Sequence, residues 1–316
     1  MNSLQIMSTG AYIQPTDSME SLAESWLSFL DAAPKTVQTY TRNIKQFLVF
    51  LQDNEVTQPQ RADVIAFRDK LTKENKSAAT IRGYLTAVKL FFSWLSQDGR
   101  YPNIAEHIKS PKVQQYFHKD HLTTRQARNL LNDCDRTTAH GARDYAIMVL
   151  MATTGLRTIE VVRANIEDIV TIGDSTALFI QGKGRDDKGE YVKLSPEVED
   201  AIRAYLSYRK ESKTGALFVS DANRNKGERM TTRSVSRICK EHLVDIGLNS
   251  DRLTAHSLRH TAAHLMIKAG ENIRNVQQVL RHSNINTTMI YLKQKNREDN
   301  NAENKAANLL FGKDVL

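Results

Sequence analysis

Apolar residues recur at intervals of three and four over the first hundred residues, which is the pattern of helices that each bury one face. Four such stretches are separated by polar residues and by Pro34 and Pro59, and no strand-like alternation interrupts them. The sequence therefore predicts a small all-helical bundle over residues 18–108, after a polar arm at 1–17. The apolar positions of the four predicted helices are Leu22, Trp26, Phe29 and Leu30; Val37, Tyr40, Ile44, Phe47, Leu48 and Leu51; Val64, Phe67 and Leu71; and Ile81, Tyr84, Leu85, Val88, Phe91, Phe92 and Leu95.

The helical pattern lapses between Gly99 and His121. Pro102, Pro111 and several lysines lie there among polar residues. Such a composition is typical of an extended connection between domains. We therefore expect a basic linker, with bounds at residues 109–122.

Helical patterns resume at Thr123, where Thr123 and Gln126 have the spacing of a capping box. The strongly apolar stretch 140–153 predicts a buried helix that ends at Gly155 in the left-handed conformation. We expect a second domain over residues 123–292. Its further helices are predicted at 197–209, 232–246, 256–269 and 272–281.

Strand-like segments occur at 177–180 and 190–194, on either side of a glycine-rich turn. They predict a β-hairpin, so the expected fold class is mainly α with a small β-hairpin or sheet. Lys183 lies in the turn between Gly182 and Gly184, and glycines allow a backbone to approach a ligand closely. The alternative is an ordinary basic hairpin tip in solvent.

The charge and cysteine content narrow the class of protein. The 316 residues include 44 Lys and Arg against 36 Asp and Glu, a net charge of +8 that suits a polyanionic partner but also fits many proteins without one. Cys134 and Cys239 lie far apart, so we expect no disulfide and a reduced, intracellular protein. The longest apolar run, 145–152, is too short to span a bilayer, and no signal segment opens the chain. We expect a cytoplasmic protein without a membrane partner.

Ionisable residues that could take part in a reaction are concentrated between positions 256 and 291. His256 and Arg259 are three apart and share a helical face. His282 follows the end of a predicted helix, and Tyr291 comes nine residues later. A cation, two imidazoles and a phenol suit an anionic substrate that is attacked by an oxygen nucleophile. Arg157, just after Gly155, would add a second cation.

These residues also allow simpler interpretations. A His-x-x-x-His pair can bind zinc, but the zinc-protease helix has Glu after the first His, where this chain has Ser257 and Thr261. We therefore expect no metal site. For His260 and His264 the favoured interpretation is a hydrogen-bonded core residue. A tyrosine between apolar neighbours, such as Tyr291, usually serves packing.

Several motifs in one order resemble the tyrosine recombinase (integrase) family, and most closely its compact Xer-type members. They are TGLRTIEV at 154–161, HSLRH at 256–260, RHSN at 281–284, and Tyr291 nine residues after His282. The resemblance extends from about residue 18 to 292. It implies a helical SAM-like core-binding domain followed by a tyrosine-recombinase catalytic domain.

The resemblance also implies a set of catalytic residues. They are Arg157, Lys183, His256, Arg259, His282 and Tyr291. The two arginines would hold the oxygens of a DNA phosphodiester, and the tyrosine would attack phosphorus to give a 3′-phosphotyrosyl link. This link stores the bond energy, so no metal, ATP or other cofactor is expected.

The remaining roles are also implied by the resemblance. His256 would accept the tyrosine proton or bond to the phosphate, and His282 would hold a phosphate oxygen. Lys183 would protonate the leaving 5′-oxygen. One position departs from the family, which commonly has glycine where this chain has Arg281. A bulky residue there would alter the helix end or add a phosphate contact.

The expected partner is double-stranded DNA with paired inverted core sites. The protein would be a monomer when free and a homotetramer on DNA, exchanging strands through a Holliday junction for integration, transposon or plasmid resolution, or dimer resolution. The alternatives are a type IB-like topoisomerase and a catalytically idle DNA-binding regulator. Strand exchange between two duplexes separates recombinase from topoisomerase, and possession of all six residues argues against the idle regulator.

The last segment, 293–316, is expected to be a tail. Residues 293–301 are wholly polar and predict a tether. A short helical pattern follows, and a helix this short needs a surface that covers its apolar stripe. That surface is either the tail's own domain or a neighbouring protomer, as the resemblance implies. The apolar positions are Ala302, Ala306, Leu309, Leu310 and Phe311.

Overall fold

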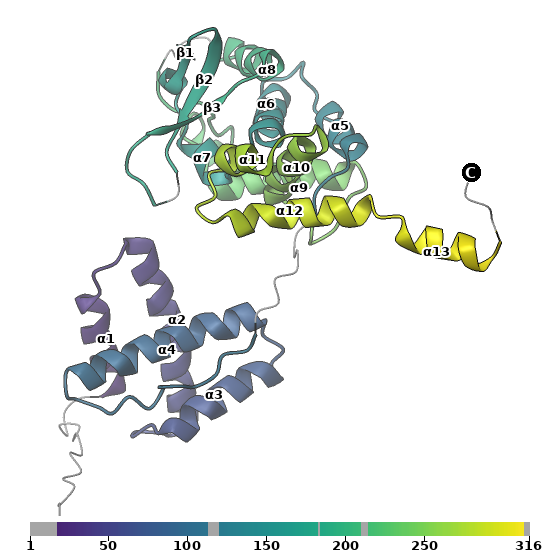
Figure 1. Cartoon of the computed structure of the whole chain (residues 1–316). Coiled ribbons are helices and arrows are strands. Elements are labelled where there is room, and N and C mark those ends of the chain that lie inside the picture. Colours follow the sequence, from purple (N-terminus) through teal and green to yellow (C-terminus); the bar gives the residue numbers. More distant parts are fainter. Residues whose placement is uncertain (1–17, 113–119, 183, 210–213, 313–316) are drawn as a thin grey trace, which may run out of the picture. The chain divides into compact units, whose positions relative to one another are not determined.

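The computed structural model describes residues 18–112, 120–182, 184–209 and 214–312, which fall into two compact units within 1–116 and 117–316 (Figure 1). The predicted fold class is confirmed: the described chain is mainly helical with one small antiparallel sheet. Lys183, the predicted arm at 1–17 and residues 113–119 of the predicted linker lie outside the described residues. The domain bounds of the sequence analysis stay predictions.

The N-terminal unit contains the four predicted helices. They are α1 (Met19–Phe29), α2 (Pro34–Asp53), α3 (Arg61–Lys73) and α4 (Ala78–Gln97). Their apolar faces meet in an aromatic core that includes Trp26, Phe47 and Phe92, each at most 1% exposed. The chain after α4 continues along this core, because Ile108 is buried and the Tyr101 hydroxyl donates to the carbonyl of Pro59 at 2.7 Å.

The C-terminal unit is built around a nearly completely buried helix, α6. Because apolar residues occur around its whole circumference, α6 packs against both α8 and α10. The helices of this unit are α5 (Thr124–Asn132), α6 (Ala139–Thr154), α7 (Thr158–Arg163), α8 (Pro196–Ser207), α9 (Thr232–Asp245), α10 (Ala255–Lys268), α11 (Ile273–Leu280), α12 (Ile285–Glu298) and α13 (Ala302–Leu310). Among the described residues, no helix has both the length and the apolar character needed to cross a membrane.

The sheet has one more strand than predicted. The expected hairpin is confirmed as β2 (Ser175–Ile180) and β3 (Glu190–Lys193), and β1 (Ile169–Ile172) pairs with the free edge of β2. The sequence analysis did not identify β1. Most of β1 is exposed, so the strand depends on backbone pairing with β2 and lacks the alternating pattern that a buried face imposes.

The predicted tether was also wrong over residues 293–298, because α12 continues to Glu298. Lys, Gln, Arg and Glu are good helix formers even without apolar neighbours. An ion pair between Lys295 and Asp299 at 2.9 Å supports the last turn of the helix. The predicted short helix after the tether is confirmed as α13.

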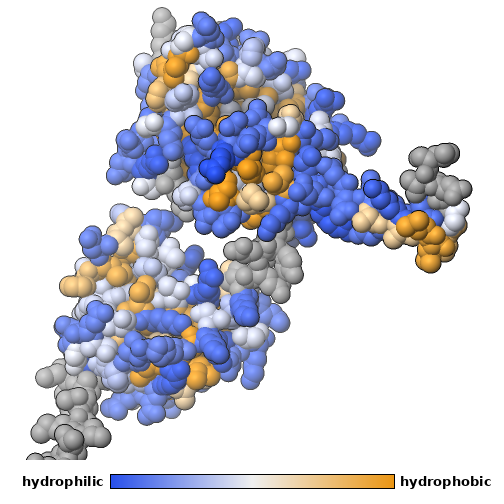
Figure 2. Space-filling view, viewed as in Figure 1, coloured by the Kyte–Doolittle hydropathy of each residue, from blue (hydrophilic) through white to orange (hydrophobic). Residues whose placement is uncertain are grey.

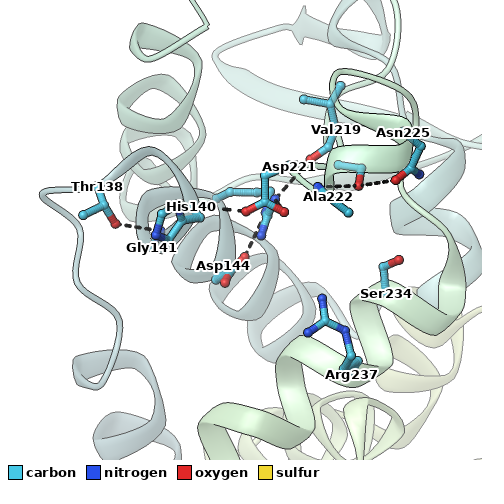
Figure 3. A network of polar contacts seen from close by, with 12 residues as sticks. Thr138, His140, Gly141, Asp144, Val219, Asp221, Ala222, Asn225, Ser234 and Arg237 are labelled. Atoms are coloured by element: carbon cyan, nitrogen blue, oxygen red, sulfur yellow. Dashed lines mark hydrogen bonds and ion pairs between the residues drawn. The ribbon is translucent and has the colours of Figure 1, made fainter.

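A buried arginine of α6 connects this helix to the loop at residues 219–225 (Figure 3). Arg143 forms ion pairs of 2.9 Å with Asp144 of its own helix and with Asp221 of the loop. It also donates to the carbonyl of Val219 at 3.3 Å. The Asp144 carboxylate also lies 3.6 Å from His242 of α9. This network holds the N-terminal half of α6 in place. The C-terminal end of the same helix leads into the candidate site.

Candidate active site

The turn after α6 places the first arginine of the site. Gly155 ends the helix with φ 66°, the predicted left-handed cap. A Cβ atom there would lie 2.5 Å from the side chain of Leu280, so a larger residue does not fit. Arg157 follows as the N-cap of α7 and is half-buried. The close packing of Gly155 against Leu280 therefore fixes the position of the backbone that leads into Arg157.

A buried carboxylate orients this arginine. The Glu160 side chain, which is fully buried, accepts from the guanidinium of Arg157 at 2.9 Å and from its backbone N–H at 2.8 Å. Arg281 donates to the same carboxylate at 2.8 Å. Burial by itself would raise the pKa of Glu160, but the charge of Arg281 and the hydrogen bonds from Arg157 more than offset it and lower the pKa. Glu160 is therefore ionised and holds two arginines.

Arg281 adopts the conformation that glycine commonly takes. It ends α11 with φ 54° and ψ 48°, in the left-handed region. Of the two consequences expected for a bulky residue here, the altered helix end does not occur, and the phosphate contact stays a prediction. The chain turns as it would at glycine, and the side chain binds Glu160 with 7% of its surface exposed.

Arg259 is the most deeply buried cation of the site. It lies on α10 and is 1% exposed, and its guanidinium donates to the carbonyls of Gly155 and Leu280. Burial and the nearby charge of Arg157 lower its pKa to about 9. Because two of its donors are bonded to carbonyls, its position is fixed before any substrate arrives.

The hydroxyl of Tyr291 is hydrogen-bonded to His260, which lies one turn beyond His256 on α10. The Tyr291 Oη and the His260 Nδ1 are 2.6 Å apart. Tyr291 is 4% exposed, and burial raises its pKa to about 12 even though Arg259 and Arg157 act to lower it. The tyrosine is thus neutral at pH 7 and keeps a proton that it can donate.

The other two histidines of the site border this pair. His256 is exposed and meets the His260 ring edge-on, with ring centroids 4.7 Å apart. His282 follows Arg281, and its Nδ1 lies 3.0 Å from the Thr288 hydroxyl. Burial and the charges of the nearby arginines lower the pKa of His282 to about 4. His282 is therefore neutral at pH 7, with a hydroxyl that fixes its ring.

Two family models match separate parts of the chain. The model described as Phage integrase family matches residues 120–298, and the one described as Phage integrase, N-terminal SAM-like domain matches residues 22–99. The chain belongs to the phage integrase family. The predicted resemblance to tyrosine recombinases, with both of its domains, is confirmed.

Curated relatives of this phage integrase family member are tyrosine recombinases. The chain is 29% identical to XerD of Listeria monocytogenes over 287 residues, which cover 86% of this chain and 94% of the relative. It is 30% identical over 295 residues to a tyrosine recombinase of Synechococcus elongatus, with 89% and 90% of the two chains covered. The protein is an Xer-like tyrosine site-specific recombinase, and is therefore an enzyme.

Solved structures show the same fold. A complex of the XerH site-specific recombinase with a palindromic difH substrate has a TM-score of 0.69 at 21% identity, over 92% of this chain and 84% of that chain. A lambda integrase dimer (75–356) bound to a COC′ core site has a TM-score of 0.68 at 18% identity, over 85% and 96% of the two chains.

The structure brings together five of the six residues that the sequence analysis selected in this integrase. Arg157, Arg259 and His282 surround the Tyr291–His260 pair, and His256 borders it. Lys183 lies outside the described residues. Its neighbour Gly182 accepts from Arg163 of α7 at 3.1 Å, which attaches the hairpin to the helix that begins after Arg157.

Sequence reasoning missed the contact of His260 with the tyrosine. We interpreted His260 as a core residue, and the structure places it half-buried against Tyr291. A signal was present: His260 is four residues after His256, so the two share a helical face. His264, also interpreted as a core residue, is buried as expected, at 8% exposure.

Two groups among the described residues have the composition of a metal site, and both lie outside this cluster. In the first, His121 stacks on His264 with ring centroids 3.9 Å apart and planes 24° apart. In the second, the contacts of His242 with Asp144, Cys134 and Asp133 raise its pKa to about 11.

Proposed function

We propose that this recombinase cuts and rejoins double-stranded DNA at specific sites through a covalent link to Tyr291. The observation that carries the proposal is a buried phenol oxygen in a cluster of cations, beside Arg157 and Arg259. A phosphodiester is an anion that repels nucleophiles, and such a cluster binds the anion and the oxygen nucleophile together.

The chemistry follows from these positions. The two arginines hold the non-bridging oxygens of the scissile phosphate and stabilise the charge that grows in the transition state. Tyr291 attacks phosphorus and displaces the 5′-oxygen, which leaves a 3′-phosphotyrosyl link and a free 5′-hydroxyl. His282 and His256 bond to phosphate oxygens. A 5′-hydroxyl of the partner strand then attacks the link, so rejoining consumes no ATP.

Lys183 is the proposed acid that protonates the leaving 5′-oxygen. The hairpin is attached to the last residue of α7, the helix that begins after Arg157, through the bond from Arg163 to Gly182. Lys188, on the same turn, forms an ion pair with Asp168 at 2.5 Å, which makes it the weaker candidate.

The proposed assembly is a tetramer on paired inverted sites, with a Holliday junction as intermediate. A lambda integrase tetramer bound to a Holliday junction shares the fold, with a TM-score of 0.65 at 16% identity over 85% of this chain and 78% of that chain. The end of α13 exposes apolar residues that a partner would cover (Figure 2). They are Leu309, Leu310 and Phe311, which are 82%, 78% and 74% exposed.

We propose that α13 docks on a neighbouring protomer. Ending the chain at Asn301 removes this helix, so we expect half-site binding to persist and cooperative filling of the second half-site to weaken in gel shifts. Wild-type cooperativity in the truncated protein would contradict docking between protomers.

The test of the proposed reaction is Tyr291→Phe, which removes the nucleophilic oxygen and leaves the charge unchanged. A nicked suicide substrate traps the covalent adduct on denaturing gels. We expect the wild-type protein to form the adduct, and the variant to bind DNA normally without forming it. A persisting adduct would refute Tyr291 as the nucleophile. Strand exchange between two duplexes separates the recombinase from a topoisomerase of the same chemistry.

A further inference from the structure

The proposed reaction requires a group that removes the proton of the attacking tyrosine. In the described structure the Tyr291 hydroxyl and the His260 Nδ1 are 2.6 Å apart, within the range of a short O–H···N hydrogen bond. Their rings are inclined at 52° with centroids 5.5 Å apart, so the contact is made through the polar atoms and not by stacking. The geometry needed for proton transfer is thus present before DNA binds.

We propose that His260 is a catalytic residue whose Nδ1 accepts the proton of Tyr291 while the phenol oxygen bonds to phosphorus. This rests on the proposed function. The Oη–P bond forms as the P–O5′ bond breaks, the phenol proton moves to Nδ1, and the leaving oxygen takes a proton from the general acid. In the rejoining step His260 returns its proton to Tyr291.

The surroundings of His260 keep the imidazole in the form that accepts a proton. Burial lowers its pKa to about 3, with further lowering from the positive forms of His256, Arg259, His121 and His282. These groups come from α10, from the segment before α5 and from the turn after α11. At pH 7 the imidazole is neutral, with its hydrogen on Nε2 and a lone pair on Nδ1 that receives the Tyr291 hydrogen bond.

The same surroundings prevent proton transfer until DNA is bound. A phenol of pKa about 12 does not ionise against an imidazole of pKa about 3. The scissile phosphate changes this balance, because it brings one negative charge that becomes two in the pentavalent transition state. An imidazolium beside that dianion is stabilised, so His260 becomes an effective base only when phosphate occupies the site. The arrangement would keep the nucleophile inactive away from its substrate.

His256 was the residue that the resemblance implied for this proton. It is exposed and lies edge-on to His260, one turn earlier on α10. Its position at the open side of the pair suits a phosphate contact, and His260 is the imidazole that bonds to the nucleophile. The two histidines would therefore divide the tasks of holding phosphate and taking the proton.

The test is single-turnover adduct formation on the nicked substrate at saturating protein. We expect His260→Ala and His260→Asn to bind a half-site as wild type does, and to form adduct about 10²–10⁴-fold more slowly. Asn retains a hydrogen-bond acceptor without a base, so it separates the loss of proton transfer from the loss of the bond. Added imidazole should restore part of the rate in His260→Ala. The matched control is His264→Asn, which removes another imidazole of the same helix and should cleave within about threefold of wild type.

A second DNA substrate shows whether His260 acts on the nucleophile or on the leaving group. DNA with sulfur in place of the bridging 5′-oxygen has a leaving group that needs no proton, so it should rescue Lys183→Ala and leave the His260 defect unchanged. A rate within threefold of wild type in both His260 variants, or rescue of either by sulfur, would overturn the proposal. Tyr291→Phe is run beside them: an adduct in that variant refutes the proposed function, whereas adduct that forms in the His260 variants at the wild-type rate refutes the base alone.

Discussion

Two buried arginines of the C-terminal unit illustrate the difference between a structural charge and a charge of the proposed catalytic site. Arg143 and Arg259 are 4% and 1% exposed, so burial alone disfavours the charge of both. The carboxylates of Asp144 and Asp221 raise the pKa of Arg143 in spite of its burial. Arg259 is bonded to carbonyl oxygens and lies near other cations, and its pKa falls to about 9.

The histidines repeat this contrast. Hydrogen bonds with Asp144, Cys134 and Asp133 raise the pKa of His242 to about 11. Burial and neighbouring cations lower the pKa of His260 to about 3 and of His282 to about 4. Since all three residues are histidines, the different directions of their pKa shifts reflect the neighbouring groups that each region supplies.

The network of Arg143 is neutralised within the protein, whereas the site of Arg259 retains positive charge. Glu160 serves two arginines of that site at once. A DNA phosphate completes the balance, which is why we interpret the excess charge as a binding site for the substrate.

The largest effect should come from breaking the network of Arg143, whose charges are neutralised within the protein. Arg143→Met removes the buried cation that Asp144 and Asp221 share and leaves Asp144 only its weaker contact with His242, so we expect the free energy of unfolding to fall by about 3–5 kcal/mol in urea titrations. The control is Arg203→Met, which removes exposed ion pairs at the surface and should change stability by less than about 1 kcal/mol. Equal losses in the two variants would contradict the structural role of Arg143.

In the candidate active site, which retains positive charge, substitution of an arginine should reduce the rate of DNA cleavage. Arg157→Ala or Arg259→Ala removes a donor to the transition state, which should cost about 2.7–4 kcal/mol, or about 10²–10³-fold in the rate of adduct formation. EDTA should leave the wild-type rate unchanged, because the arginines supply the charge stabilisation. Full activity in either variant, or inhibition by EDTA, would contradict this mechanism.

The histidines should give the two limbs of the pH–stability curve. The folded pKa of His242 is raised from 6.5, so its contribution is complete below pH 6.5 and is lost as pH rises toward 11. The folded pKa of His282 is lowered from 6.5, so its contribution is complete above pH 6.5 and is lost as pH falls toward 4. In urea titrations from pH 4 to 10, we expect His242→Gln to flatten the alkaline limb and His282→Gln the acid limb. Curves parallel to wild type would contradict both shifts.

The smallest effect should be at Arg281. Arg281→Ala and Arg281→Gly both remove the ion pair with Glu160, but only glycine relieves the left-handed backbone. We therefore expect the alanine variant to be less stable than the glycine variant by about 1 kcal/mol. A more stable alanine variant in thermal and urea unfolding would show that the backbone at this position is not strained.

Local patterns in the sequence determined much of this fold. The four helices of the first unit follow from apolar spacing, because one helix face meets one core. The cap at Gly155 and the hairpin β2–β3 follow from residues adjacent in the chain. The same holds for the order of the motifs, which identified the family before any geometry was known.

The tertiary structure alone decided which groups meet. The bond from His260 to Tyr291 spans 31 residues, the bond from Arg259 to Gly155 spans 104, and the bond from Arg281 to Glu160 spans 121. Strand β1 likewise exists because β2 offers it an edge. Periodicity shows which face of an element is buried but not what that face meets, and the charge of a buried group depends on those neighbours.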